Sequence, residues 1–304
     1  MNTISTSVHK SQTILVIGRT GQLGQSLESI AALYAEYEFV FVGREQFDME
    51  GETEMHTFFE NYTFDIIINC AAYTSVDKAE TDQHSANSIN NIAVLRLSKV
   101  AKKYGIKLIH ISTDYVFNGK SYRPYRETEK VDPLSVYGKT KLEGENAILR
   151  VLPTNAIILR TSWLFSEYGN NFLKTMLKLG QRNDKLNIVS DQVSTPTYAK
   201  DLAKTIMIII QSHLFEQNSF KTSIYNFSNE GVCSWFDFSK VIFDIAAIKC
   251  NVHPIETKDY PTPATRPYYS VLNKNKIKEN FNVTIPFWKD SVKKCLVNLM
   301  DQSD

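Results

Sequence analysis

Cysteine is scarce in this chain, and its placement excludes two kinds of site. The 304 residues include four cysteines, Cys70, Cys233, Cys250 and Cys295, and no two of them form a CxxC pair. This pattern argues against a zinc site and against a disulfide framework, and it is typical of a protein of the reducing cytosol. We therefore expect a cytoplasmic protein.

Long apolar runs and an excess of charge are missing as well. The longest apolar run near the middle, 206–210, is far too short to cross a bilayer. The net charge of +1 gives no general attraction to nucleic acid or to an anionic membrane, so neither is an expected partner and any anionic ligand needs a local site. Residues 1–12 are polar and lack the apolar core of a signal peptide, and we expect a disordered arm there.

Short apolar runs alternate with helical patterns through the first half of the chain. The runs predict buried strands at 13–17, 38–42, 65–70, 107–112 and 156–161, and the periodic segments predict helices over 22–34 and 77–104. Strands that alternate with helices indicate βαβ units and a parallel sheet covered on both faces. The fold class expected is therefore α/β, with a Rossmann-type doubly wound parallel sheet.

The last third of the chain differs in composition. It holds five of the nine prolines and a cluster of aromatic residues, among them Trp235 and Phe238. This composition predicts a smaller α+β lobe that binds substrate over the strand ends. We expect the dinucleotide-binding domain to cover 13–165 and about 188–228, and the lobe to cover about 166–187 and 229–304.

A glycine-rich turn joins the first strand to the first helix. The residues are Gly18-Arg-Thr-Gly21-Gln22-Leu23-Gly24, a GxxGxxG spacing rather than GxGxxG. Glycine permits the tight turn, and the N-terminus of the following helix favours a pyrophosphate. A plain strand-to-helix turn is the alternative, but the strand before and the helix after favour a dinucleotide site.

The end of the second strand bears on the choice of cofactor. NAD-binding folds often carry an acid there for the ribose 2′-hydroxyl, whereas this strand ends Val42-Gly43-Arg44. Arg44, with Arg19 as a second candidate, could pair with a 2′-phosphate through its planar fork of donors. The pattern favours NADPH, with NADH as the alternative. Arg44 could instead be a solvated loop residue, and Glu45 could neutralise it.

Two further segments predict the chemistry of the site. Thr113 stands at the end of the 107–112 strand, where ligands of such sheets bind, and Tyr137 and Lys141 follow at i and i+4 on one helix face. A free phenol has a pKa near ~10, which a nearby ammonium lowers, so the pair suits proton transfer to a carbonyl oxygen held by a hydroxyl. An incidental Tyr and Lys on an exposed helix face is the alternative.

The chain closely resembles the dTDP-4-dehydrorhamnose reductases. The segments that carry the resemblance run nearly end to end: GRTGQLG at 18–24, NCAAYTSVDKAE at 69–80, STDYVFNG at 112–119, PLSVYGKTKLEGE at 133–145, RTSWLFSEYGNNFLKTML at 160–177, DQVSTPTYAKDLA at 191–203, CSWFDF at 233–238 and YPTPATRPYYSVL at 260–272. The resemblance implies an NAD(P)H-dependent reductase of the extended short-chain dehydrogenase kind. Its expected reaction is reduction of the C4 ketone of dTDP-4-dehydro-L-rhamnose to dTDP-L-rhamnose.

The resemblance also implies residue roles. Those expected at the cofactor are Gly21, Gln22 and Leu23 at the pyrophosphate, Asp48 and Met49 near the adenine, and Ala71, Ala72 and Tyr73 along the cofactor beyond the third strand. Those expected in catalysis are Thr113, Tyr137 and Lys141, with Lys141 also binding the nicotinamide ribose. Those expected at the dTDP-sugar are Asp114 and Trp163, with Asn171 and Arg266 as weaker candidates. For Trp163 the alternative is a core aromatic.

One departure from the family bears on metal binding. Some members hold Mg²⁺ with carboxylates, one of them on the first helix, where this chain has Ser26. Because hard cations prefer charged oxygen ligands, we expect no bound metal. The resemblance leaves a homodimer open, without the metal link of some relatives.

Two rival functions remain on the same fold. A 4,6-dehydratase usually has an Asp-Glu pair after the Thr, whereas Thr113-Asp114 is followed here by Tyr115; another nucleotide-sugar reductase or a 4-epimerase stays open. A non-catalytic regulatory subunit is the rival from a different class. The intact Tyr137–Lys141 pair argues against it.

Overall fold

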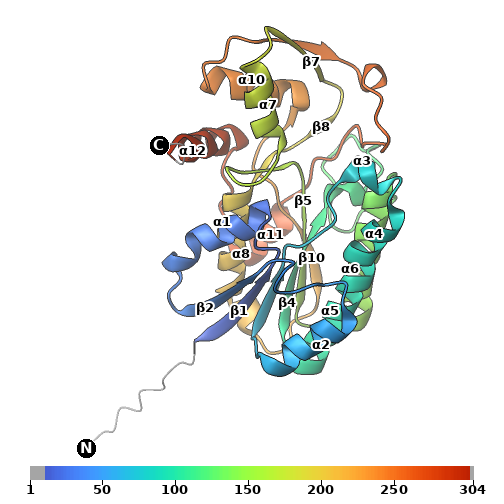
Figure 1. The fold of residues 1–304 in the computed structure, drawn as a ribbon, viewed down its shortest axis with the longest axis vertical. Helices are drawn as coiled ribbons and strands as arrows, with labels where there is room; N and C mark the ends of the chain where they lie inside the picture. Colours follow the sequence, from blue (N-terminus) through green and yellow to red (C-terminus); the bar gives the residue numbers. More distant parts are fainter. Residues whose placement is uncertain (1–10, 302–304) are drawn as a thin grey trace, which may run out of the picture.

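A six-stranded parallel sheet forms the centre of the protein in the computed structural model, which describes residues 11–301. The strand order is β10-β5-β4-β3-β1-β2 (Figure 1). The strands are β1 (Gln12–Ile17), β2 (Tyr37–Val42), β3 (Ile66–Asn69), β4 (Lys107–Thr113), β5 (Ala156–Thr161) and β10 (Ser223–Asn226). The expected parallel sheet is confirmed.

The expected N-terminal arm falls mostly outside the described residues. Positions 1–10 of the predicted 1–12 segment are not described, and Gln12 already belongs to β1, paired with Tyr37 of β2. The predicted end of the arm was therefore wrong by one residue at least. Strand β1 begins at Gln12, one residue before the apolar run 13–17 that predicted it.

The order of the strands reverses between β1 and β3. The chain passes from β1 outward to β2 and then back across β1 to β3, which pairs with β1 on the other side. In open α/β sheets, ligands bind at such a reversal, beyond the carboxyl ends of the strands. The glycine-rich turn follows β1 at this point.

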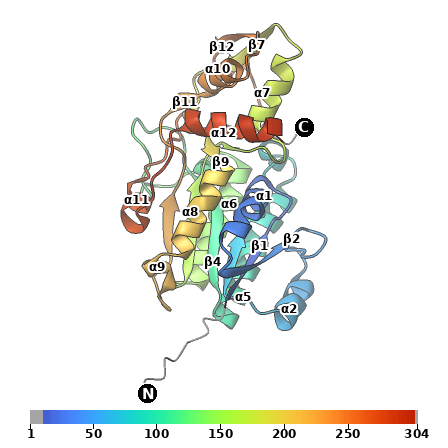
Figure 2. The same ribbon diagram turned by 90° about the vertical axis from the view of Figure 1, so that its left-hand side faces the viewer.

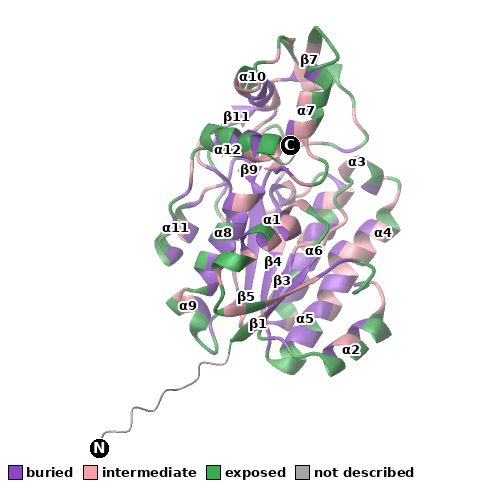
Figure 3. Ribbon diagram, turned by 60° about the vertical axis from the view of Figure 1, so that its left-hand side comes forward, coloured by how far each residue is buried: buried purple, intermediate pink, exposed green. Residues whose placement is uncertain are grey.

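Helices cover both faces of the sheet. One face packs against α1 (Gln22–Ile30), α8 (Ala199–Ile210), α9 (His213–Glu216) and α11 (Asn275–Phe281), and the other against α2 (Glu52–Asn61), α5 (Ala93–Tyr104) and α6 (Val136–Val151) (Figures 1 and 2). Leu15 and Ile14 on successive positions of β1 belong to opposite cores and are both fully buried. Figure 3 shows the buried strands between helices whose outer faces are exposed. The two-sided burial explains why the strands are continuous apolar runs.

The long helix predicted over 77–104 is wrong. The segment contains α3 (Val76–Ala79), α4 (Gln83–Asn87), a π-helical turn η2 (Ser88–Ile92) and only then α5. Asp82 starts α4 by accepting a hydrogen bond from the Ser85 amide. Asn90 lies inside the π-turn, fully buried. The helix predicted over 22–34 is also shorter, because a 3₁₀ turn, η1 (Ala31–Leu33), follows α1.

A smaller group of elements sits over the carboxyl ends of the strands (Figures 1 and 2). Its helices are α7 (Phe172–Gly180), α10 (Trp235–Ile245) and α12 (Trp288–Asp301). Its strands form three pairs: β7 (Lys185–Val189) with β12 (Asn251–Ile255), β8 (Val193–Ser194) with β11 (Cys233–Ser234), and β6 (Leu164–Phe165) with β9 (Thr197–Tyr198). A separate core that includes Phe238 and Trp288 holds them together. The proposed domain boundaries stay a prediction.

Within residues 11–301, no helix combines the length and apolar character that crossing a membrane requires.

Candidate functional site

The turn after β1 has a backbone that only glycine adopts without strain. Gly18 has a φ of +93°, and a Cβ there would lie 2.8 Å from the Ala71 amide nitrogen. The turn is held by the Gly18 and Arg19 amides, which both donate to the Val42 carbonyl at 3.0 Å. Helix α1 then begins at Gln22, with Gly21 as an N-cap that offers no side-chain acceptor. Its first amide groups therefore remain available to an anion.

A cavity of about 690 Å³ opens beside this turn at the carboxyl ends of β1, β2 and β3. The predicted cofactor residues that line it are Gly18, Gly21, Gln22, Leu23, Arg44, Asp48, Met49, Ala71 and Ala72. The predicted residues that do not line it are Gly24, which packs under the turn, and Tyr73, Tyr137 and Lys141. The structure thus gathers most of the expected set from three separate stretches of sequence.

The two candidate arginines are placed differently. Arg44 lines the cavity and pairs with Glu50 at 2.8 Å, with its side chain 75% exposed. Arg19 pairs instead with Glu28 on α1, also at 2.8 Å, and is not among the cavity residues. Of the two guanidinium groups, only Arg44 is therefore placed to reach a ligand in the cavity.

The predicted catalytic trio converges from β4 and α6. Thr113 ends β4 near Tyr137, and its hydroxyl donates to Asp114 Oδ1 at 3.1 Å. Ser135 caps α6 by accepting from the Gly138 amide at 3.1 Å, so Tyr137 lies in the first turn. A Cβ on Gly138 would come within 2.3 Å of the Tyr115 carbonyl oxygen, so glycine lets the helix start approach the strand end.

The charges in the trio differ from the expectation. Burial raises the pKa of Tyr137 to about 12; the Thr113 hydrogen bond lowers it and the Asp114 charge raises it. Burial also lowers the pKa of Lys141 to about 8. We expected Lys141 to lower the pKa of the phenol, but burial raises that pKa and Lys141 is not among the groups that shift it. Lys141 Nζ is directed at the Ile111 carbonyl, 2.7 Å away, and at His110 Nε2, 3.2 Å away.

His110 and Asn69 belong to this cluster, although sequence reasoning missed them. Both side chains are fully buried, and Asn69 Nδ2 lies 3.1 Å from His110 Nδ1. Polar residues inside the apolar runs IIIN and KLIHIS were the only indication in the sequence. A buried polar side chain in a central strand needs partners, and here those partners lead to Lys141.

Asn90 is a second residue that sequence reasoning missed. From the π-turn, its amide accepts from the Tyr73 amide at 2.9 Å and donates to the Tyr73 carbonyl at 3.1 Å and to Thr140 Oγ1 at 3.2 Å. Asn90 therefore ties the segment after β3 to α6. The hydroxyl of Tyr73 is directed away, to Asp82 at 3.2 Å.

Two of the predicted substrate residues show unusual local structure. Asp114 is 1% exposed, its Oδ2 has no hydrogen-bond partner, and burial raises its pKa to about 6. Trp163 has a φ of +46°, and its ring stacks on Trp235 with centroids 3.4 Å apart. A bulky residue in the left-handed region and an unpaired buried carboxylate oxygen are both features that concentrate at ligand sites.

The two weaker substrate candidates have partners within the protein. Asn171 caps α7 and donates to Gln22 Oε1 at 3.0 Å, which joins this helix to the glycine turn. Arg266 forms an ion pair with Asp77 at 2.6 Å, and this pairing lowers the pKa of Asp77. Both terminal nitrogens of Arg266 donate to Asp77 in this arrangement.

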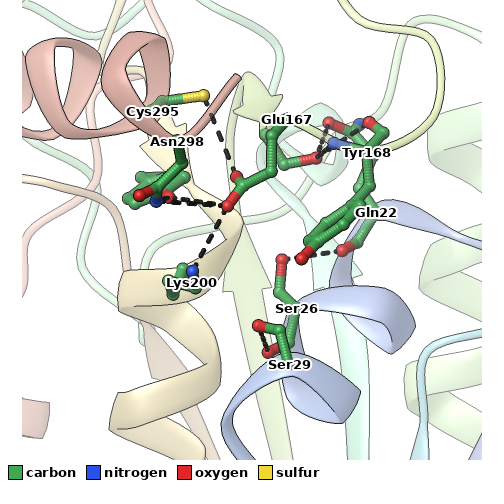
Figure 4. Close-up of polar contacts among 10 residues, drawn as sticks. Gln22, Ser26, Ser29, Glu167, Tyr168, Lys200, Cys295 and Asn298 are labelled. Carbon is green, nitrogen blue, oxygen red and sulfur yellow. Dashed lines mark hydrogen bonds and ion pairs between the residues drawn. The ribbon is translucent and has the colours of Figure 1, made fainter. Parts of the chain in front are cut away.

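The surroundings of Ser26 do not fit a metal ion. Ser26 is fully buried, and its hydroxyl donates to the Gln22 carbonyl at 2.8 Å (Figure 4). The buried carboxylate in the same view, Glu167, accepts from Tyr198 and Asn298 and pairs with Lys200 at 3.3 Å. Residues 11–301 contain no group of three His, Cys, Asp or Glu side chains placed to hold a metal.

Comparisons with known proteins agree with this geometry. The model of the family described as "RmlD substrate binding domain" matches residues 12–300. Proteins named dTDP-4-dehydrorhamnose reductase are similar over nearly the whole chain: that of Aggregatibacter actinomycetemcomitans is 40% identical, covering 92% of this chain and 97% of its own, and that of Sinorhizobium fredii is 38% identical, covering 94% and 97%. The crystal structure of dTDP-4-dehydrorhamnose reductase from Bacillus anthracis in complex with NADP superposes with a TM-score of 0.89 at 34% identity, covering 95% of this chain and 100% of that one.

Proposed function

Because this chain belongs to the RmlD substrate binding domain family, we propose that it reduces the C4 ketone of dTDP-4-dehydro-L-rhamnose to dTDP-L-rhamnose with NADPH. It is an NAD(P)H-dependent oxidoreductase of nucleotide-sugar metabolism. The observation that carries the proposal is the Tyr137–Lys141 pair at the start of α6, with Lys141 Nζ directed at the Ile111 carbonyl of β4. Strand β4 is the neighbour of β3, at whose end the cavity opens.

The cavity beside the glycine turn fits a dinucleotide. The left-handed Gly18, the free amides at the start of α1 and the lining from β1 to β3 are the features that a pyrophosphate-bridged ligand needs. Arg44 at the rim supplies a cation for a 2′-phosphate, which favours NADPH over NADH. When bound, the nicotinamide supplies the hydride for the ketone carbon.

Tyr137 supplies the proton. A reduction needs a protonated acid at the start, and the raised pKa of Tyr137 keeps its phenol protonated at neutral pH. The carbonyl oxygen becomes strongly basic as alkoxide character develops, so even this weak acid transfers its proton favourably. Thr113 lies near the phenol, and its hydroxyl can turn from Asp114 Oδ1 to offer a second hydrogen bond to the same oxygen.

Asp114 and Trp163 are the proposed sugar contacts. The unpartnered Oδ2 of Asp114 can accept a hydrogen bond from a sugar hydroxyl, which would satisfy a buried atom that has no partner in the protein. The Trp163–Trp235 stack supplies an apolar surface on which a sugar ring can pack. Asn171 acts through Gln22, and Arg266 would pair with the diphosphate after exchanging its bond to Asp77.

The assembly and the cellular site are extensions of the same proposal. We propose a cytoplasmic enzyme that binds a dTDP-sugar. The net charge of +1 gives it no general attraction to nucleic acid or to an anionic membrane. A homodimer stays a prediction, which sedimentation velocity at micromolar concentration would test.

The reaction is tested with purified protein, NADPH and the keto sugar nucleotide. We expect NADPH to be consumed in equal amount to the sugar reduced; an epimerase would convert the sugar without net consumption, and a regulatory subunit would do neither. Tyr137→Phe keeps the ring and removes the proton donor, so kcat should fall by about 10²- to 10⁴-fold while NADPH affinity changes little. The proposal fails if Tyr137→Phe keeps most of the wild-type turnover.

A further inference from the structure

A row of buried polar side chains extends from Lys141 into the sheet. Asn69 at the end of β3, His110 in β4 and Lys141 on α6 are each at most 1% exposed. Strand pairing sets Asn69 directly opposite His110. Asn69 Nδ2 lies 3.1 Å from His110 Nδ1, and His110 Nε2 lies 3.2 Å from Lys141 Nζ. The three groups therefore form one continuous path.

The direction of these hydrogen bonds is determined from the Asn69 end. The Ala71 amide can only donate, and it donates to Asn69 Oδ1 at 3.1 Å. The NH₂ group of Asn69 is thereby directed at His110 Nδ1, which must accept. In a neutral imidazole the proton then lies on Nε2, and Nε2–H is aimed at Lys141 Nζ.

Only the uncharged form of Lys141 complements this arrangement. An ammonium carries three donors and no acceptor, whereas an amine has a lone pair that can accept from Nε2–H. The amine can donate to the Ile111 carbonyl at 2.7 Å at the same time. The other His110 tautomer would set Nδ1–H against the Asn69 NH₂ group, and turning that amide over would deprive the Ala71 N–H of its acceptor.

The charged groups around Lys141 do not reverse this preference. Glu145, one turn further along α6, is bound by Arg160 from β5 at 2.6 and 2.9 Å and by Ser112 at 2.5 Å. It acts on Lys141 only at longer range. Cys70, beyond β3, is the other titratable group that acts on Lys141, and burial raises the pKa of its thiol, which keeps it neutral.

We propose that His110 is a positioning residue for Lys141: oriented by Asn69, its imidazole donates Nε2–H to Lys141 Nζ and favours the uncharged amine. Burial acts in the same direction, since it lowers the pKa of Lys141 to about 8 and holds the pKa of His110 below its usual range. In the reaction proposed above, on which this step rests, each turnover leaves Tyr137 as a phenolate. The Lys141 amine can take a proton from solvent and pass it to that phenolate, which restores the amine.

The first test reads the tautomer in the unaltered protein. Histidine labelled with ¹⁵N distinguishes a protonated Nε2 from a protonated Nδ1 by NMR, and a His110→Leu spectrum assigns the signal. We expect His110 to be neutral with the proton on Nε2 from pH 6 to 9. A proton on Nδ1, or an imidazolium in that range, overturns the proposal.

The second test titrates Lys141 itself. Protein labelled with ¹³C and ¹⁵N in lysine reports the Lys141 pKa by NMR in the wild type, His110→Leu and Asn69→Asp. The carboxylate that Asn69→Asp introduces keeps an oxygen for the Ala71 amide and offers another to Nδ1–H, which frees Nε2 to accept from an ammonium. We expect the Lys141 pKa to rise by one unit or more in both variants, a tenfold gain in proton affinity.

A control variant and the pH profile of activity distinguish a failure of this proposal from a failure of the proposed function. His84→Gln, on the exposed surface of α4, should leave the Lys141 pKa unchanged. Unchanged Lys141 titration in Asn69→Asp overturns the proposal even if His110→Leu fails to fold. The titration needs no substrate, so it can succeed where reduction of the keto sugar fails. If the His110 proposal and the proposed reductase function both hold, the alkaline limb of the pH profile of kcat/KM shifts in each variant by as much as the Lys141 pKa.

Discussion

At the scale of single residues, we predict that Arg44 decides the choice between the two nicotinamide cofactors. It lines the cavity, whereas Arg19 is bound to Glu28 outside it. In Arg44→Ala, the loss of a charge-assisted contact to a 2′-phosphate should cost about 1.5–3 kcal/mol. The ratio of kcat/KM for NADPH to that for NADH should therefore fall by about 10- to 150-fold.

Arg19→Ala is the matched control for this measurement. It removes a guanidinium from the glycine-rich turn after β1, outside the cavity, and should leave the cofactor ratio unchanged. A ratio that stays constant in Arg44→Ala as well would show that another group reads the 2′ position.

Asp114 should make stability depend on pH. Its folded-state pKa of about 6 lies above the value of about 3.9 expected for an unfolded chain. The folded state therefore holds the proton more tightly, and stability falls as pH rises from about 4 to about 6. Asp114→Asn removes this loss. The unfolding free energy of the variant minus that of the wild type should therefore be about 1–3 kcal/mol larger above pH 7 than at pH 4.

The measurement is the difference in unfolding free energy between wild type and Asp114→Asn, from urea denaturation at several pH values. The difference cancels the other titrating groups. A difference that does not vary between pH 4 and pH 7 would show that the carboxyl is not destabilised by its burial.

Residue types at the site were predictable, but their partners were not. The Tyr137–Lys141 spacing predicts one helix face, yet the direction of Lys141 toward His110 depends on a contact 31 positions away. Arg266 and Asp77 are 189 positions apart, so their ion pair has no sequence pattern. Distances of this kind follow only from the strand order.

At the scale of elements, the π-turn η2 is where local periodicity failed. The apolar spacing over 77–104 predicts one helix, but Asn90 turns inward to bind both backbone groups of Tyr73. The hydrogen bonds that stabilise this inward turn join Asn90 to Tyr73, 17 positions earlier. Helical periodicity carries no information about such a contact. The strands, by contrast, were predictable because burial on both faces makes each a continuous apolar run.

Asn90→Ala should therefore destabilise the protein. It leaves the part-buried amide and carbonyl of Tyr73 without their side-chain partner, and each such group costs about 1–3 kcal/mol. Urea denaturation measures the change. Asn91→Ala, which removes a bond only to Asn87 within the same helical segment, is the control and should cost less. Equal losses would contradict the role given to Asn90.

At the scale of the whole molecule, the site lies where the sheet and the smaller group of elements meet. The glycine turn contacts α7 through Gln22 and Asn171, and α3 contacts the chain before α11 through Asp77 and Arg266. The α/β class and the parallel sheet were predictable from alternating patterns. The pairing of β7 with β12 was not, because β8, β9, β10 and β11 all come between these two short strands along the chain.

The whole protein should work without a divalent metal. Ser26 uses its hydroxyl within α1, and Glu167 is neutralised by Lys200. We expect reductase activity to stay nearly intact after dialysis against EDTA. Strong inactivation that Mg²⁺ restores would show that other carboxylates form a site.

The central claim is the reduction of the sugar at C4, and isotope transfer tests it most directly. NADPH that carries deuterium at its transferable position is mixed with the protein and dTDP-4-dehydro-L-rhamnose, and the product is examined by NMR. The account predicts one deuterium at C4 of the sugar for each NADPH oxidised. NADPH oxidation without deuterium in the sugar, or deuterium at another carbon, would contradict it.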